Sequence, residues 1–305
     1  VFAGNVWIEA RQRQPMEAFD RGYVVSVLAD NFGNGLSSFF PLYLRDDAQP
    51  RDLFAADKDA DRIDAGEGRR FNLSRAAVAY LRSISADDKA DALFYHIVAV
   101  LHAPAYRSEN AGALRQDWPR IPLPSTREAL LASAELGCTV AELLDSERPV
   151  PGVTTDVIDE RLRPIAVLSV AGGGQVNLAD GDLDVTAGWG YAGRDGIVMP
   201  GKGRVIERRA QESEINPALG IKGATLDVYL NKRVYWRNVP PRVWEYTAGG
   251  YQVLKKWLSY RKKPVLGRSL TIDEAREVTA IARRIARLLL LSKDLDANYR
   301  RVASQ

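Results

Sequence analysis

The sequence contains few of the residues that form disulfides, metal sites and catalytic pairs. Cys138 is the single cysteine, and His96 and His102 are the only histidines. One cysteine excludes a disulfide framework and a cysteine-rich zinc site. The two histidines are six positions apart, which would place them on different faces of a helix, and no third ligand stands nearby. No metal site is therefore predicted. No serine lies in a G-x-S-x-G turn, and the sequence contains no convincing catalytic constellation.

Long apolar runs are also missing. The longest one near the C-terminus, 281–291, is interrupted by arginines and is far shorter than the ~20 residues that cross a bilayer. No membrane span is therefore predicted. Neither Met nor a secretory segment stands at the start of the chain, so we expect a part of a longer polypeptide. The single cysteine favours a reducing, cytoplasmic setting.

Positive charge is concentrated in the last third of the chain. Residues 200–305 carry 22 Lys and Arg against 10 Asp and Glu, whereas residues 1–199 carry 20 against 29. Between Asn231 and Lys263 there are nine basic residues and one acid, Glu245. A surface of one charge sign attracts ligands of the opposite sign, and a phosphate backbone is the commonest such ligand.

Changes of pattern predict three parts. Residues 1–45 alternate apolar and polar side chains at 23–30 and 37–45 around the turn NFGNG, which predicts two strands of a hairpin or meander at the end of a preceding region. Residues 46–163 are mainly helical. Residues 164–305 show short strands and glycine turns, followed by helices. The predicted fold class is α+β, with a helical subdomain before a mixed β-sheet and hairpin subdomain that ends in C-terminal helices.

The helical part begins with an acidic, turn-rich stretch over 46–70, which we expect to be a surface loop or linker. Asn72 is predicted to cap the first helix. The next helix stops before Pro104, and TREALLASAELGCTVAELLDSE (126–147) predicts a further one. The inner face of the helix before Pro104 is predicted to carry Leu93, Phe94, Ile97, Val98 and Leu101.

The C-terminal part contains three local signals. Asn231-Lys232 stands where a tight turn would join two strands. GWGYAG (188–193) formally matches a dinucleotide fingerprint, but no helix follows it, so a glycine-rich hairpin is the preferred interpretation. Thr271 with Glu274 three residues later predicts a capping box at the start of the last helical segment.

The stretch from Tyr251 to Lys263 predicts an amphipathic helix with a basic ridge. At about 100° per residue, one half of the wheel carries the apolar and aromatic side chains and the other half carries the lysines. Few acids are interleaved to form compensating pairs. The apolar half consists of Tyr251, Val253, Leu254, Trp257, Leu258 and Tyr260. The polar half consists of Gln252, Lys255, Lys256, Ser259, Lys262 and Lys263.

Two long blocks and one short segment resemble a known family. They are LFYHIVAVLHAPAYRSENAGALRQDWPRIPLP (93–124), VWEYTAGGYQVLKKWLSYRKKPVLGRSLTIDEAREVTAIARRI (243–285) and FFPLYL (39–44). They are similar to the C-terminal part of single-polypeptide Type I (Type ISP) restriction–modification enzymes and of related large adenine-N6 DNA methyltransferases of phage defence. In that family a nuclease, a helicase-like ATPase, a methyltransferase and a target-recognition domain occur on one polypeptide.

The resemblance implies that this chain is the recognition part. The Asn-Pro-Pro-Tyr-type motif of such methyltransferases is missing, since the only Asn-Pro is NPAL at Asn216. Catalytic centres, and the S-adenosylmethionine cofactor, are therefore expected outside this chain, with no cofactor within it. The implied partners are double-stranded DNA and the N-terminal methyltransferase and restriction domains of the parent, in a prokaryotic cytoplasm. The helical subdomain would dock on the catalytic part.

Two groups of DNA-contacting residues follow from this hypothesis. Contacts to the DNA backbone are predicted for Lys232, Arg233, Arg237, Lys255, Lys256, Arg261, Lys262 and Lys263. Base reading is predicted from the glycine-rich hairpins between Gly172 and Lys222, with the candidates Arg194, Lys202, Arg204, Arg208, Gln175, Asn177 and Asn216. The alternative is a protein- or RNA-interaction module with a basic face, which would bind without regard to duplex sequence.

Overall fold

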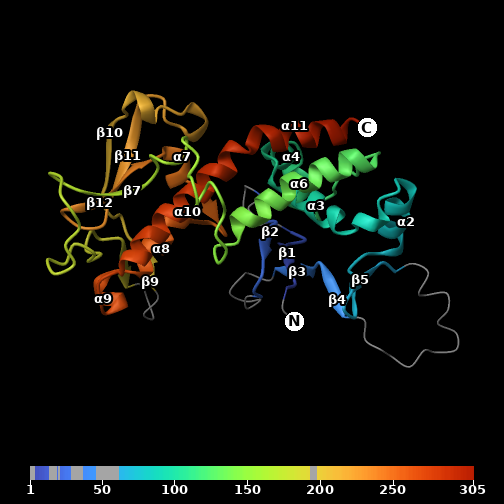
Figure 1. Ribbon diagram of the computed structural model, residues 1–305, viewed down its shortest axis with the longest axis horizontal. Coiled ribbons are helices and arrows are strands. Elements are labelled where there is room, and N and C mark those ends of the chain that lie inside the picture. The colour runs from blue at the N-terminus through green and yellow to red at the C-terminus, as the bar shows by residue number, and fades with distance from the viewer. Residues whose placement is uncertain (1–3, 14–18, 20, 29–36, 46–61, 193–197) are drawn as a thin grey trace. The chain divides into compact units, whose positions relative to one another are not determined.

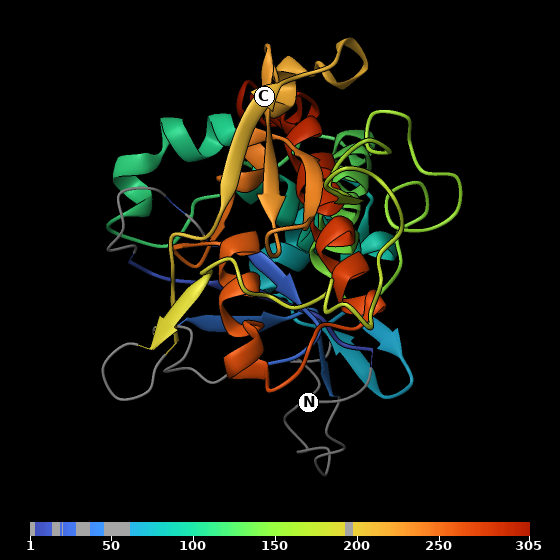
Figure 2. The ribbon, with the colours of Figure 1, turned by 90° about the vertical axis from the view of Figure 1, so that its left-hand side faces the viewer.

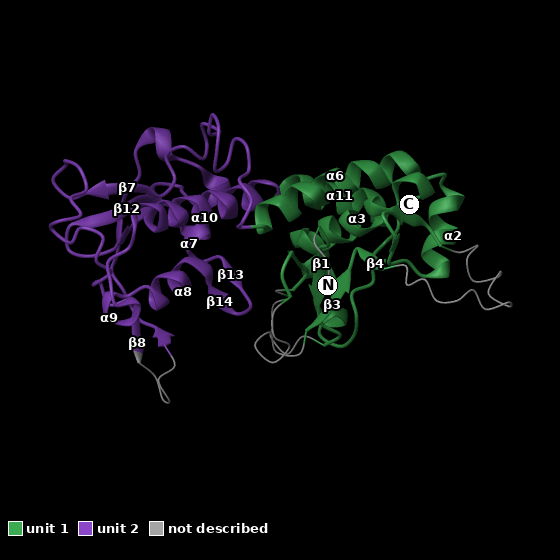
Figure 3. Ribbon diagram, turned by 60° about the horizontal axis from the view of Figure 1, so that its bottom comes forward, with its two compact units in different colours: residues 1–145, 292–305 green, residues 146–291 purple. Residues whose placement is uncertain are grey.

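A computed structural model describes residues 4–13, 19, 21–28, 37–45, 62–192 and 198–305. The predicted α+β fold class is confirmed, because small antiparallel sheets and helices follow one another in separate runs along the chain, which ends in helices (Figure 1). The chain divides into two compact units, shown in Figure 3. Unit 1 contains 1–145 and 292–305, and unit 2 contains 146–291.

Two small antiparallel sheets open unit 1. In the first, β1 (Trp7–Ala10) is the middle strand between β2 (Tyr23–Val25) and β3 (Ser38–Pro41). The predicted hairpin or meander of 23–30 with 37–45 is therefore wrong in its pairing, because β2 and β3 each pair with β1 and not with each other. The predicted NFGNG turn lies outside the described residues. A pairing with a strand from a distant part of the sequence leaves no local signal.

The second sheet has the order β4-β6-β5. Its strands are β4 (Tyr43–Arg45), β5 (Asp64–Gly66) and β6 (Arg69–Phe71). The predicted loop over 46–70 is thus wrong in its last part, which forms the β5–β6 hairpin. Residues 46–61 lie outside the described part. This hairpin could not be predicted from the sequence DAGEGRRF, because its strands are short and polar.

Helices form the remainder of unit 1. They are α2 (Arg75–Ser83), the short 3-10 helix η1 (Asp87–Lys89), α3 (Asp91–His102), α4 (Pro104–Glu109), α5 (Ala111–Leu114), α6 (Arg127–Leu144) and α11 (Ser292–Ala303). Ser74, and not the predicted Asn72, caps α2, because its Oγ accepts from the Ala77 amide at 3.2 Å. Asn72 instead donates to the Pro41 carbonyl at 2.9 Å. None of the helices in the described part combines the length and apolar character of a bilayer crossing.

The core of unit 1 lies where α3 packs on α6. Of the predicted inner face of α3, Leu93, Phe94, Val98 and Leu101 are buried, and Ile97 is half-buried. The two helix backbones approach so closely at Gly137 that a Cβ there would overlap the Tyr95 carbonyl. Only glycine permits this contact, so the fit of α3 against α6 depends on Gly137.

A chain of hydrogen bonds ties the C-terminal helix to this core. Asn298 of α11 donates to Ser133 Oγ at 2.8 Å, and Ser133 lies 2.7 Å from His96 Nδ1. His96 Nε2 lies 2.9 Å from the Pro122 carbonyl, which can only accept, so Nε2 carries the proton and Nδ1 accepts from Ser133. The prediction placed the last helix within 164–305, but α11 belongs to unit 1 through these contacts.

Unit 2 is built on a four-stranded antiparallel sheet of order β10-β11-β12-β7. Its strands are β7 (Val167–Val170), β10 (Val205–Arg209), β11 (Ala224–Tyr229) and β12 (Val234–Val239). The predicted turn at Asn231 between β11 and β12 is confirmed: Asn231 Oδ1 accepts from the amides of Arg233 and Val234 at 2.9 and 2.8 Å.

Helix α10 (Ile272–Leu290) covers one face of the sheet, since Trp236 of β12 donates its Nε1 proton to the Ala275 carbonyl at 3.1 Å. The predicted capping box of Thr271 and Glu274 begins this helix. The remaining elements of unit 2 are β8 (Gly190–Ala192), β9 (Val198–Pro200), the short 3-10 helices η3 (Glu212–Glu214) and η4 (Pro217–Leu219), α7 (Pro241–Trp244), β13 (Thr247–Ala248), β14 (Tyr251–Gln252), α8 (Val253–Tyr260) and α9 (Lys263–Leu266).

We expect Gly137→Ala to destabilise unit 1 by about 2 kcal/mol or more, because the added methyl group forces α3 and α6 apart. Gly112→Ala in α5 is the matched control, since a Cβ there meets open space and alanine favours helix. Chemical unfolding of both variants checks this. Equal stability of Gly137→Ala and the parent chain would contradict the close approach.

A second prediction concerns acid stability. Burial lowers the pKa of His96 from 6.5 to about 4, so the folded protein binds one proton fewer than the unfolded chain between those values. Stability should therefore fall as the pH drops from 6.5 towards 4, by up to about 1.4 kcal/mol per pH unit from this residue. The measurement is the urea midpoint at pH 7 and pH 5. His96→Gln should lose less stability over this interval, and an unchanged loss would assign the effect to other groups.

Candidate nucleic-acid interface

Helix α8 carries the centre of the predicted basic ridge, but it is shorter than predicted. Leu254, Trp257 and Leu258 are buried as expected. Tyr251 and Tyr260 were assigned to the buried side and are 47% and 45% exposed. Ser259 was assigned to the exposed side but is fully buried; its hydroxyl donates to the Lys256 carbonyl at 2.7 Å. Helix α8 covers only 253–260 of the predicted 251–263, so Tyr251 lies before the helix, whereas Ser259 and Tyr260 lie within it.

Lys255 and Lys256 project from α8 without a carboxylate partner among the described residues. The Lys256 ammonium lies between two tyrosine rings, 4.3 Å from the centroid of Tyr251 and 4.6 Å from that of Tyr260. Cation–π attraction of this kind holds the ammonium in place without neutralising it. The exposed tyrosines thus flank the basic helix, a feature that the wheel analysis missed.

The three cations after α8 have different surroundings. The Arg261 guanidinium lies 3.9 Å from the ring centroid of Trp257 and 3.9 Å from Glu277. Lys262 donates to the carbonyl of Gly190. Lys263 forms an ion pair of 2.7 Å with Asp184. Hydrogen bonds from Lys263 and Ser269 lower the pKa of the Asp184 carboxyl, so Lys263 is neutralised within unit 2.

The turn between β11 and β12 is fastened to the same acidic segment, 180–184. Asn231 Nδ2 donates to the carbonyls of Asp182 and Asp184 at 2.8 and 3.1 Å. Arg233 lies 3.6 Å from Asp180 and 3.4 Å from Asp182. Lys232 is exposed and has no ion-pair partner in the described chain. Among the cations of this turn, Lys232 is therefore the one whose charge is not paired with a carboxylate of the described chain.

Arg208 and Arg237 form an ion-pair network on the sheet. Arg208 binds Glu214 at 2.8 Å and Asp227 at 3.1 Å, and Arg237 binds Glu214 at 2.9 Å. Burial would raise the pKa of Glu214, but hydrogen bonds from Arg208, the Gln211 amide and Arg237 outweigh it and lower the pKa to about 2. These arginines hold unit 2 together, and we therefore leave both out of the proposed DNA contacts.

Within GWGYAG, Gly190–Ala192 form β8, which pairs antiparallel with β9, and this agrees with the preferred interpretation of the sequence as a hairpin. The Trp189 ring is fully buried, and its Nε1 donates to the Tyr229 carbonyl at 2.7 Å. A Cβ at Gly203 would overlap this ring, and one at Gly190 would lie 2.7 Å from the Ser259 carbonyl of α8. Strand β9, in yellow in Figure 2, accordingly lies beside the orange α8. The glycines allow the hairpin to pack against this helix.

The remaining base-reading candidates are dispersed. Lys202 and Arg204 are exposed between β9 and β10, whereas Arg194 lies outside the described residues. Asn177 donates to Asp180 at 2.8 Å and accepts from the Ala179 amide at 3.0 Å, so its side chain is engaged in a local turn. Gln175 is exposed in the same loop.

Asn216 lies apart from these residues. Its backbone forms a bridge to Ile221 at the edge of a polar pocket of about 190 Å³. Of the base-reading candidates that the structure describes, Lys202 and Arg204 are the ones that directly follow β9, the strand that packs on α8.

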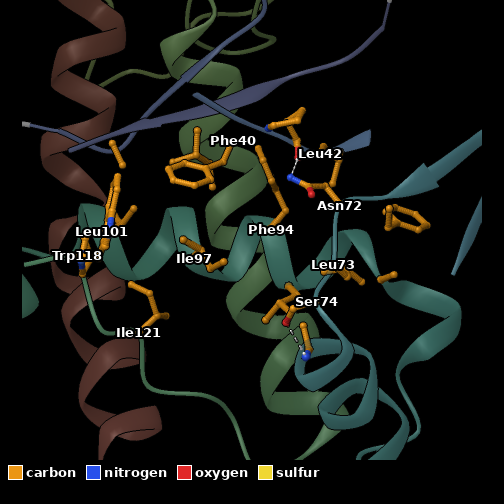
Figure 4. A pocket seen from close by; sticks show the side chains of 18 residues that line it. Phe40, Leu42, Asn72, Leu73, Ser74, Phe94, Ile97, Leu101, Trp118 and Ile121 are labelled. Carbon is orange, nitrogen blue, oxygen red and sulfur yellow. Dashed lines mark hydrogen bonds between the residues drawn. The ribbon is translucent and has the colours of Figure 1, made fainter. Parts of the chain in front are cut away.

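Unit 1 contains an apolar cavity of about 540 Å³ between its first sheet and α3 (Figure 4). Phe40 and Trp118 meet edge to face at its rim, with 5.4 Å between ring centroids. Its described lining residues include no titratable side chain, so it offers no group for acid–base chemistry. No cluster of metal-ligating side chains occurs among the residues that the structure describes.

Comparison with known proteins gives one family. The family model described as the Type ISP C-terminal specificity domain matches residues 4–290. No curated protein sequence matches the chain.

Three solved structures resemble the chain. One is the DrdV–DNA complex, at 17% identity and a TM-score of 0.55, covering 96% of this chain and 24% of that one. The second is a nuclease-deletion mutant of the Type ISP restriction–modification enzyme LlaGI with a DNA substrate mimic, at 14% identity and a TM-score of 0.47, covering 97% and 21%. The third is the ATP-dependent Type ISP enzyme LlaBIII bound to DNA, at 14% and 0.49, covering 97% and 16%. The chain thus spans a quarter or less of each.

Trp257 is expected to act through packing. Its ring is 8% exposed, so Trp257→Ala should destabilise unit 2 by about 3–5 kcal/mol. Its Nε1 is buried without a hydrogen-bond partner, so Trp257→Phe loses no hydrogen bond and should cost much less. Thermal unfolding checks both variants. A Trp257→Ala variant with the stability of the parent would show that the side chain is not a core residue.

Proposed function

Because the chain belongs to the family of Type ISP C-terminal specificity domains, we propose that it recognises a double-stranded DNA target for a restriction–modification enzyme. Family membership is the first ground for this proposal. The second is that the cations around α8 have no carboxylate partners among the described residues. DNA attracts such cations because each neutralised phosphate releases counterions.

The cations predicted to contact the DNA backbone fall into two classes. Arg233, Arg237 and Lys263 have carboxylate oxygens within 3.6 Å, so their charges are paired within unit 2. The other class consists of Lys232, Lys255, Lys256 and Lys262, for which the described residues provide no ion-pair partner. Arg261 is intermediate between the two classes, because its guanidinium lies 3.9 Å from the Glu277 carboxylate. The proposed phosphate contacts are therefore the second class together with Arg261.

Phosphate contacts position a protein on the duplex, and base contacts specify the sequence. The β8–β9 pair packs on α8, and Lys202 and Arg204 directly follow β9, so these residues are the preferred base-reading candidates. Arg194, which falls between β8 and β9 in the sequence and lies outside the described residues, remains a candidate as well. Bases read by these side chains would set the target of the enzyme.

The rest of the reaction is assigned to other parts of the parent polypeptide. An adenine-N6 methyltransferase domain would bind S-adenosylmethionine, and the cytoplasm would be the site of action. Unit 1 would dock on the catalytic part.

The double variant Lys255→Ala/Lys256→Ala tests the proposal. It should weaken binding to all duplexes alike, and the slope of log K against log salt should fall by about 2. Fluorescence anisotropy with labelled duplexes over a salt series measures both. The matched control, Lys293→Ala/Arg300→Ala, removes the same charge from exposed positions of α11 and should leave the slope nearly unchanged.

Two results would contradict the proposal. Unchanged affinity and slope in the Lys255/Lys256 variant would show that the lysines only face solvent. A preference of the parent chain for single strands or RNA, without discrimination among duplex sequences, would instead support the interaction-module alternative.

A further inference from the structure

The face of the unit 2 sheet opposite α10 carries a pair of stacked tyrosines. Successive side chains of a strand point to opposite faces, so Tyr235 points away from α10 when its neighbour Trp236 contacts it. Tyr235 is paired in register with Tyr229 of β11. Their rings are stacked, with centroids 4.8 Å apart and an interplanar angle of 17°.

Arg204 extends this stack by a third planar group. Its guanidinium carbon lies 4.2 Å from the centroid of the Tyr229 ring. Cation–π attraction holds the guanidinium against the ring and leaves its N–H edge open. Arg204 is exposed, and no carboxylate within the described residues pairs with it. Arg208, on the same stretch of chain, is by contrast fully engaged with Glu214 and Asp227.

The main chain around Arg204 is fixed on both sides. The Arg204 carbonyl accepts from the Tyr229 amide at 2.9 Å. Gly203 packs against Trp189, whose Nε1 donates to the Tyr229 carbonyl. The backbone of Arg204 is thus held in place, and its guanidinium is held by the Tyr229 ring. Little conformational entropy of this side chain therefore remains to be lost on binding.

The stack is connected to one of the proposed phosphate contacts, Lys262. Gly190, next to Trp189 in β8, accepts a hydrogen bond from Lys262. Trp189 thus lies between the end of α8 and Arg204. A duplex held by the α8 lysines would come within reach of this arginine.

We propose that Arg204, oriented by the Tyr229–Tyr235 stack, reads a guanine in the major groove of the target. The fork of guanidinium N–H donors matches the O6 and N7 acceptors of guanine, a pattern that no other base presents there. Tyr229 and Tyr235 are positioning residues that do not touch the base. The inference rests on the proposed function and names one base-specific contact within it.

The test compares duplex preferences of the full chain and its variants. Selection from a random duplex pool identifies the preferred sequence, and binding constants are then measured for duplexes with each position changed in turn. Arg204→Ala should lose about ten- to a hundredfold of discrimination for guanine at one position, with the other positions unaffected. Arg209→Ala, which removes the same charge from an exposed residue of β10, should keep that discrimination.

The tyrosine variants separate positioning from simple stabilisation. Tyr229→Phe keeps the ring and should keep the guanine preference, whereas Tyr229→Leu should weaken it at the same position as Arg204→Ala. If Arg204→Ala keeps every preference of the parent chain and only lowers the melting temperature, the stack is structural and the inference is overturned, while the proposed function stands. If the parent chain selects no duplex sequence at all, the proposed function fails and this inference with it.

Discussion

The burial of Trp189 is the contact on which the arrangement of unit 2 depends. Its ring fills a space that Gly203 leaves open, and its Nε1 is bound to the Tyr229 carbonyl. This contact joins the β8–β9 hairpin to the sheet, and Gly190 joins the hairpin to α8. One aromatic side chain between glycines thereby fixes the positions of Lys262 and Arg204 relative to each other. Larger residues at these glycines would separate them.

Charge pairing then determines which cations remain available. An ion pair inside a folded domain stabilises it only when both partners stay together, and removing one leaves an uncompensated charge. Glu214 holds Arg208 and Arg237, and Asp184 holds Lys263. The α8 lysines lack such partners within the described chain. The proposed interface therefore includes the unpaired cations and excludes the paired ones. Net charge alone could not have separated these two groups.

Local signals in the sequence predicted much of the fold and less of the site. The capping box at Thr271, the turn at Asn231 and the burial of Trp257 depend on residues a few positions apart, and all three are confirmed. Long-range pairing was not predictable: β1 separates β2 from β3, and Asp184 reaches Lys263 across 79 positions. The helical wheel misassigned Tyr251, which precedes α8, and also Ser259 and Tyr260 within the helix, because periodicity alone does not show which side chains the rest of unit 2 covers.

The central claim is that the lysines around α8 contact the DNA backbone. Acetylation footprinting of the chain with and without its selected duplex, read by mass spectrometry, tests it residue by residue. We predict that DNA protects Lys232, Lys255, Lys256 and Lys262 from acetylation and leaves Lys293 of unit 1 as reactive as before. Equal reactivity of the α8 lysines in the bound and free protein, with the duplex shown to be bound, would contradict the account.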